Sequence, residues 1–112
     1  MTELRVATEF SRYLGGRYRD DGPWSGEEFR EDFLRPRIER AIKSHGVLHV
    51  VFDGVAGMPT SFLEEAFGGF LRTPGIDVVA VRGALKLDAD DPDLWPYLKL
   101  AEKFMDQQAK RR

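Results

Sequence analysis

The sequence predicts an α/β protein: one domain over residues 1–112, with a four- to five-stranded mixed sheet and about three helices packed on it. Short apolar, β-branched runs alternate with longer segments whose apolar residues recur at helical spacing. Such alternation implies crossover connections, which set neighbouring strands parallel and place helices on the sheet. A length of 112 residues is that of one ordinary domain.

Several segments have the composition of strands. Residues 3–10 alternate apolar and polar side chains and predict a first strand. Residues 47–53 are almost continuously apolar, which is typical of a central strand covered by helices. Residues 76–81 predict a third strand, which can resume at 84–87, and turn signals around 17–19 allow a short hairpin strand.

Three segments carry helical patterns, the second of which belongs to the candidate site below. The first begins at Ser25, where Glu28 three residues later predicts a capping box. Pro36 inside this pattern predicts either a kink or two helices, with the proline at the start of the second. The third helix begins after residues 90–92, Asp-Asp-Pro, and carries basic residues toward its C-terminal end.

The composition excludes several classes of protein. A net charge of -2 with 32% charged residues provides no general attraction to nucleic acid or to a membrane. The absence of cysteine excludes disulfides, thiolate metal sites and thiol catalysis, and it suits a reducing compartment. No apolar run approaches the roughly 18 residues of a membrane span, and the N-terminus lacks the pattern of a signal peptide. We therefore expect a cytoplasmic protein.

No set of residues in the sequence indicates catalysis, a metal site or a cofactor. His45 and His49 lack a third ligand at a suitable spacing, and His49 is expected to face solvent or make a hydrogen bond from a strand. Glu64 and Glu65 are neighbours on a helix and point about 100° apart, so they are no preset acid–base pair. The loop at 54–61 lacks both the P-loop lysine and the dinucleotide glycine pattern. We expect no enzyme activity.

The candidate functional site is the loop and helix start that follow the strand at 47–53. Ser61 with Glu64 forms a second capping-box pattern, so the cap belongs chiefly to Ser61. Thr60 is then the freer hydroxyl, and a phosphate there would be tolerated at the positive end of the helix dipole. Thr60 and Ser61 are the candidate phosphoacceptors. Asp53, at the carboxyl end of the strand, is either a ligand contact or a turn former.

The surface around this loop predicts a contact with a partner or a ligand. Two adjacent glycines at 68 and 69 lie inside the helical pattern, where each costs on the order of 1 kcal/mol relative to alanine. That cost suggests close packing of the helix against the sheet or a partner. The candidate contact residues are Asp53, Gly54, Gly57, Met58, Pro59, Glu64, Glu65 and Gly68.

Three blocks of the sequence together resemble a known family. They are G-P-W-S-G-E-E-F-R-E-D-F-L-R-P at 22–36, V-F-D-G-V at 51–55 and T-S-F-L-E-E-A-F-G-G at 60–69. These blocks resemble the STAS-like domains of unknown function called DUF4325, small proteins of bacteria, archaea and phages. The resemblance implies a STAS-like fold.

That family is in turn similar to the STAS domains of anti-sigma-factor antagonists. Their D-S-S-G-L motif at a helix start carries a serine that a partner kinase phosphorylates. Aligned on the strand and on Met58, the D-S-S positions fall on Pro59, Thr60 and Ser61, and Phe62 stands where the motif has glycine. The resemblance thus implies that Thr60 is the phosphoacceptor and that a protein is the partner.

Three functions fit the sequence. The first is a non-enzymatic interaction and regulatory module whose partner is a protein, with a histidine-kinase-like ATPase as the candidate. The second is a small-molecule, anion or nucleotide-binding domain, or an enzyme, that uses the same loop with Asp53, Ser61 and Glu65. The third is a structural homodimer or other homo-oligomer, with residues 68–69 and Trp95 at the contact.

Overall fold

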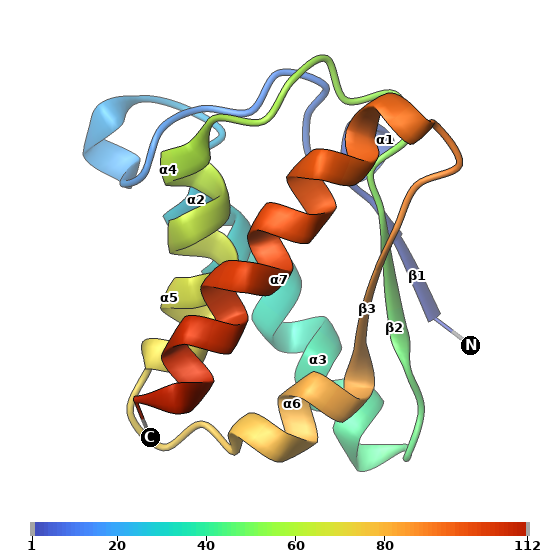
Figure 1. The fold of residues 1–112 in the computed structure, drawn as a ribbon, viewed down its shortest axis with the longest axis vertical. Helices are drawn as coiled ribbons and strands as arrows, with labels where there is room; N and C mark the ends of the chain where they lie inside the picture. Colours follow the sequence, from blue (N-terminus) through green and yellow to red (C-terminus); the bar gives the residue numbers. More distant parts are fainter. Residues whose placement is uncertain (1, 112) are drawn as a thin grey trace.

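The structure is a computed structural model that describes residues 2–111. Within them the strands are β1 (Thr2–Arg5), β2 (Leu48–Val51) and β3 (Leu85–Asp88). They form one parallel sheet in the order β1-β2-β3 (Figure 1). The strand predicted over 47–53 is therefore confirmed, and it is the central strand.

Helices connect the strands and cover one face of the sheet. A long helix with a π-helical stretch in its middle lies between β1 and β2 in the chain. A second helix of the same kind follows β2 and leads toward β3. The helical elements are α1 (Val6–Glu9), η1 (Arg19–Asp21), α2 (Gly26–Glu28), η2 (Phe29–Leu34), α3 (Arg35–Lys43), α4 (Thr60–Leu63), η3 (Glu64–Gly68), α5 (Gly69–Arg72), α6 (Val78–Ala84), η4 (Pro92–Leu94) and α7 (Trp95–Lys110).

The predicted sheet of four to five mixed strands is wrong. Over residues 2–111 the sheet has three strands, all of them parallel. Apart from the 3₁₀ turns, and with each π-helical stretch joined to its flanking helices, five helical segments accompany it where about three were expected: α1, α2–α3, α4–α5, α6 and α7. No strand forms at 17–19, which runs into the 3₁₀ turn η1. The protein remains an α/β fold, because parallel strands still alternate with helices.

The segment predicted as the third strand is instead the helix α6. Asp77 caps this helix, since its carboxylate accepts a hydrogen bond from the N–H of Ala80 at 3.0 Å. Val81 and Ala84 are buried three residues apart, whereas Val79 is 82% exposed. This helical spacing of buried residues outweighs the β propensity of the valines. The strand begins only at Leu85, in the predicted continuation.

The first strand is shorter than the predicted span of 3–10. Glu9 accepts a hydrogen bond from the N–H of Arg5 at 2.8 Å, which closes the short helix α1. The turn of the chain carries Phe10 into an aromatic cluster. Its ring centroid lies 5.4 Å from that of Trp24, 5.1 Å from that of Phe29 and 5.0 Å from that of Phe33.

The helix predicted from Ser25 is confirmed at its start. The Ser25 hydroxyl accepts the N–H of Glu28 at 3.1 Å, while the Glu28 carboxylate accepts the N–H of Trp24. In η2 the N–H of Arg35 donates to the carbonyl of Arg30, five residues back. This wider turn immediately precedes Pro36, which lacks an N–H, so the chain continues into α3 without a separate second start.

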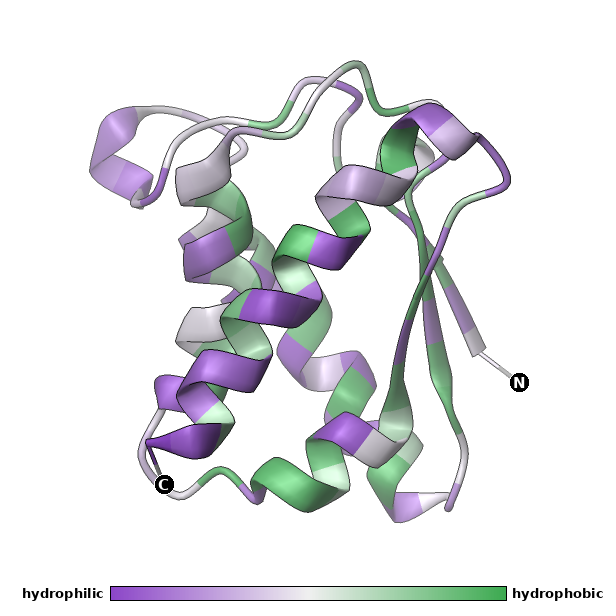
Figure 2. Ribbon diagram, viewed as in Figure 1, coloured by the Kyte–Doolittle hydropathy of each residue, from purple (hydrophilic) through white to green (hydrophobic). Residues whose placement is uncertain are grey.

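The hydrophobic core lies between the sheet and the helices. The largest side chains in it are phenylalanines from β2's end and from both connecting helices, namely Phe29, Phe52, Phe62 and Phe67. Helix α7 packs across η3, α4 and α5 with Leu98, Ala101 and Met105 buried, and hydrophilic and hydrophobic residues alternate along its ribbon (Figure 2). The core thus fixes the helix that carries Thr60 against the rest of the molecule.

Candidate functional site

The loop after β2 is held in place by a neighbouring segment. The N–H of Ala56 donates to the carbonyl of Arg12 at 2.8 Å, and Nε of Arg12 donates to the carbonyl of Gly54 at 3.1 Å. Tyr13 and Gly57 form a parallel bridge. Gly54 has a φ of 93°, a conformation that favours glycine. The candidate loop therefore has a fixed conformation beside residues 12–13. The two segments run next to each other at the top of Figure 1.

The exposed side of this loop continues to Thr60. Val55 and Met58 point inward, at 6% and 5% exposure, and anchor the loop to the core. The outward side chains leave a shallow hollow of about 440 Å³ bordered by the loop and by Tyr13, which is 68% exposed. We call the exposed or half-exposed residues Tyr13, Ala56, Gly57, Pro59 and Thr60 the Thr60 surface.

The predicted cap by Ser61 is wrong. The helix begins at Thr60, Pro59 occupies the cap position, and no side chain caps the first amides. Ser61 is half-buried in the first turn, and Thr60 is exposed. Within residues 2–111 the Thr60 hydroxyl makes no hydrogen bond. Both candidate phosphoacceptors thus lie at the helix start, and Thr60 is the more accessible.

Glu64 and Glu65 are committed to arginines of this chain. Glu64 accepts two hydrogen bonds from Arg72, at 2.6 and 3.0 Å, and a third from Arg17. Glu65 is 6% exposed and binds Arg30 and Arg17. We call these five residues the arginine–glutamate cluster. Sequence reasoning missed it because its partners lie far apart along the chain.

The arginines lower the pKa of Glu64 in the cluster and of Glu31 beside it. Hydrogen bonds from Arg72 lower the pKa of Glu64, burial opposes them, and the hydrogen bond from Arg17 adds to the decrease. Burial would raise the pKa of the neighbouring Glu31, but hydrogen bonds from Arg30 and Arg35 lower it overall. These carboxylates therefore remain ionised and are ill-suited to act as general acids near neutral pH.

The adjacent glycines at 68 and 69 are buried inside the molecule. A Cβ on Gly68 would lie 2.8 Å from Oε2 of Glu64 and 3.4 Å from Cβ of Phe104 on α7. A Cβ on Gly69 would lie 2.9 Å from Nη1 of Arg30. The glycines are closely packed as predicted, but against α7 and the arginine–glutamate cluster and not against the sheet or a partner.

Asp53 stabilises the loop that follows β3. Its carboxylate accepts the N–H groups of Asp90 and Asp91 at 2.9 to 3.1 Å, and these bonds lower its pKa, with Asp90 contributing most. A polar hollow of about 520 Å³ adjoins it at the carboxyl ends of the strands. There Nδ1 of His49 lies 2.6 Å from Oδ2 of Asp88, so the expected hydrogen bond of His49 is confirmed.

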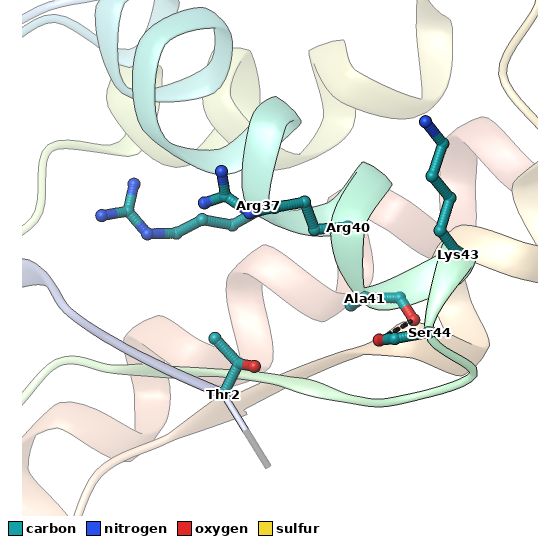
Figure 3. A pocket seen from close by; sticks show the side chains of 6 residues that line it. All are labelled: Thr2, Arg37, Arg40, Ala41, Lys43 and Ser44. Atoms are coloured by element: carbon teal, nitrogen blue, oxygen red, sulfur yellow. Dashed lines mark hydrogen bonds between the residues drawn. The ribbon is translucent and has the colours of Figure 1, made fainter.

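A further hollow of about 430 Å³ lies between Thr2 and the end of α3 (Figure 3). Arg37 and Arg40 extend to one side of it, whereas Lys43 points away from them. Arg37 is bound to Glu9 at 3.0 Å. These cations do not converge on one point, and cations at a helix C-terminus are favoured by its dipole.

Within residues 2–111 the structure contains neither a group of metal ligands nor a membrane-spanning helix. Across residues 2–111, no three acidic or histidine side chains are grouped as metal ligands. In the same span, every helix is too short or too polar to cross a bilayer. Asp53, Ser61 and Glu65 share no hydrogen-bond partner: the first binds the loop after β3 and the last binds the arginine–glutamate cluster.

Comparison with known proteins identifies one family. The family model described as STAS-like domain of unknown function (DUF4325) matches residues 25–82, just over half of the 112-residue chain. The match extends from the Ser25 cap through the loop and Thr60 to α6. No curated protein and no solved structure matches the chain.

Proposed function

The chain belongs to the STAS-like family DUF4325, and on that basis we propose that it is a non-enzymatic, regulatory protein-interaction module whose partner binds the Thr60 surface. The observation that carries the proposal is the exposed, hydrogen-bond-free Thr60 beside an anchored loop. The cysteine-free composition suits a cytoplasmic setting.

The Thr60 surface has properties of a binding site for a protein. Tyrosine is enriched at protein interfaces, and Tyr13 is 68% exposed beside the shallow hollow. The loop is fixed by hydrogen bonds with the carbonyl and the side chain of Arg12, so little order has to be gained on binding. These features support recognition by a partner that places a side chain in the hollow.

Phosphorylation of Thr60 would give this surface two states. The first amides of the helix lack a side-chain cap, so a phosphate could accept hydrogen bonds from them at the positive end of the dipole. It would add about two negative charges where the partner binds. The STAS resemblance makes a histidine-kinase-like ATPase the candidate partner. The alternative ligand-binding or enzymatic function gains no support, because Asp53, Ser61 and Glu65 do not converge.

A site-specific cross-link tests the proposal. A photoreactive amino acid replaces Ala56, which is exposed on the Thr60 surface, and in a control replaces Gln107, which is exposed on α7. We expect a defined protein to be captured in cells from position 56 and not from 107. Thr60→Glu should reduce capture at least tenfold, and Gln107→Glu, which adds the same charge elsewhere, should leave it unchanged.

Two outcomes would contradict the proposal. Equal capture from both positions would mean that the Thr60 surface has no special role. Capture that is undiminished by Thr60→Glu would exclude a charge switch at this residue, while leaving the surface as the site of contact.

A further inference from the structure

One face of the sheet is left uncovered by the helices. Strand residues alternate between faces, and Leu4, Leu48 and Val50 point into the core. The helices α2 to α5 and α7 lie on that side, and none of the described helices covers the other side (Figure 1). Parallel sheets normally have both faces covered, so this face calls for an explanation. The open sheet face consists of Glu3, Arg5, His49, Val51, Lys86 and Asp88.

The charges on this face follow a regular pattern. In the register of the sheet, Glu3 is level with Lys86 and Arg5 is level with Asp88, on opposite edge strands. Along β1 the negative Glu3 precedes the positive Arg5. Along β3 the positive Lys86 precedes the negative Asp88. Within residues 2–111 Lys86 forms no ion pair, whereas Arg5 pairs with Glu3 at 2.8 Å and His49 with Asp88 at 2.6 Å. The side chains of Glu3 and Arg5 are nevertheless 50% and 55% exposed, so both can meet a second charge.

We propose that a second copy of this chain packs on the open sheet face, related to the first by a two-fold axis parallel to β2. Rotation about this axis leaves each residue at the same height along the strand direction. It places β1 of one copy opposite β3 of the other. Glu3 then faces Lys86 of the second copy, and Arg5 faces Asp88 of the second copy. His49 and the 8% exposed Val51 lie near the axis, opposite their own equivalents. Lys86 gains an ion-pair partner, and Glu3, Arg5 and Asp88 each gain an opposite charge in addition to the partner they have within the chain.

The expected dimer is weak. Three strands about 4.8 Å apart, with four residues at a rise of about 3.3 Å, present roughly 200 Å² per copy. A standard interface uses about 800 Å² per partner, so the surrounding loops must contribute and the complex is transient. Exposed charge pairs are screened within about 10 Å at 0.1 M salt, so association should weaken as salt is raised.

Charge reversal with complementation tests the proposal in the whole chain. Sedimentation equilibrium at low salt should show a mass that rises with concentration from 12.8 kDa toward twice that value. Glu3→Lys alone and Lys86→Glu alone should each remain monomeric, because each places like charges opposite one another. An equimolar mixture of the two should associate again, since every reversed charge then meets an opposite one. Lys103→Glu, exposed on α7, is the matched control and should behave as the wild type.

The mixture makes the test independent of folding defects, because two misfolded variants would not restore each other. A wild type that stays monomeric at every concentration overturns the proposal. So does a mixture that stays monomeric, or an equal loss of association in Lys103→Glu. None of these outcomes bears on the Thr60 surface, which lies on the loop side of the molecule.

Discussion

The helix over residues 60–72 has a buried middle part and an exposed start, and the two parts play different roles. From Glu64 to Gly68 the two carboxylates are bound to arginines, the Phe67 ring packs in the core and Gly68 lies against α7, and four of the five residues are buried. At the start of the helix, Thr60 is exposed and uncapped. Residues that looked like one candidate site along the sequence therefore separate into a structural group and an accessible group. Only the accessible group remains available to a partner.

The largest effect is expected from breaking the arginine–glutamate cluster. Glu65→Ala removes a carboxylate that the largely buried Arg30 binds. Removing one partner of a buried ion pair costs about 3 kcal/mol. Chemical denaturation should show this loss in the free energy of unfolding. Glu102→Ala, which breaks the more exposed pair with Arg82, should cost less than about 1 kcal/mol. Equal losses would mean that the cluster contributes no more than a surface pair.

A smaller effect is expected from filling the space at Gly68. The Cβ of Gly68→Ala would lie 2.8 Å from the fixed carboxylate of Glu64, and we expect a net loss of about 1 kcal/mol despite the better helix propensity. Gly83→Ala is the control, because a Cβ there meets nothing within 4 Å. It should raise the free energy of unfolding by about 0.5 kcal/mol. A stabilising Gly68→Ala would show that the Glu64 carboxylate moves aside for the added methyl group.

The cluster should also make stability depend on acid pH. Because the folded-state pKa of Glu64 lies below its ordinary value of 4.5, its contribution is fully present above that value and is lost as the pH falls through the depressed pKa. Thermal unfolding followed from pH 7 to pH 2 should therefore show a steeper decline for the wild type than for Glu64→Gln. Parallel curves would mean that this carboxylate has the same pKa in the folded and unfolded chains.

The smallest effect on stability is expected at Thr60. Its hydroxyl makes no hydrogen bond within the described residues, so Thr60→Val should change the free energy of unfolding by less than about 0.5 kcal/mol. The same substitution should remove the phosphate that the proposed switch places on Thr60, as measured by mass spectrometry of protein isolated from cells. A large loss of stability would place Thr60 in the structural group and remove the contrast.

Local signals predicted part of this fold. The strand over 47–53 and the helix start at Ser25 were predictable because composition, spacing and capping agree there. The helix α6 was missed because its valines favour strands, although the Asp77 cap and the spacing of Val81 and Ala84 indicated a helix. The surplus strands came from this error and from the hairpin strand predicted at 17–19.

The division of the candidate site could not be predicted from the sequence. Glu64 and Arg17 are 47 residues apart, and Glu65 and Arg30 are 35 residues apart, so no local pattern connects them. Asp53 likewise binds amides 37 and 38 residues away. The sequence located the loop and Thr60, but long-range contacts decide which of its neighbours are free.

The most direct test of the central claim is a hydrogen–deuterium exchange map of the chain bound to its captured partner. The proposed function predicts slower exchange in residues 12–14 and 54–62, with unchanged exchange over the outer face of α7. Protection confined to α7 or to the open sheet face, with none at residues 54–62, would contradict it.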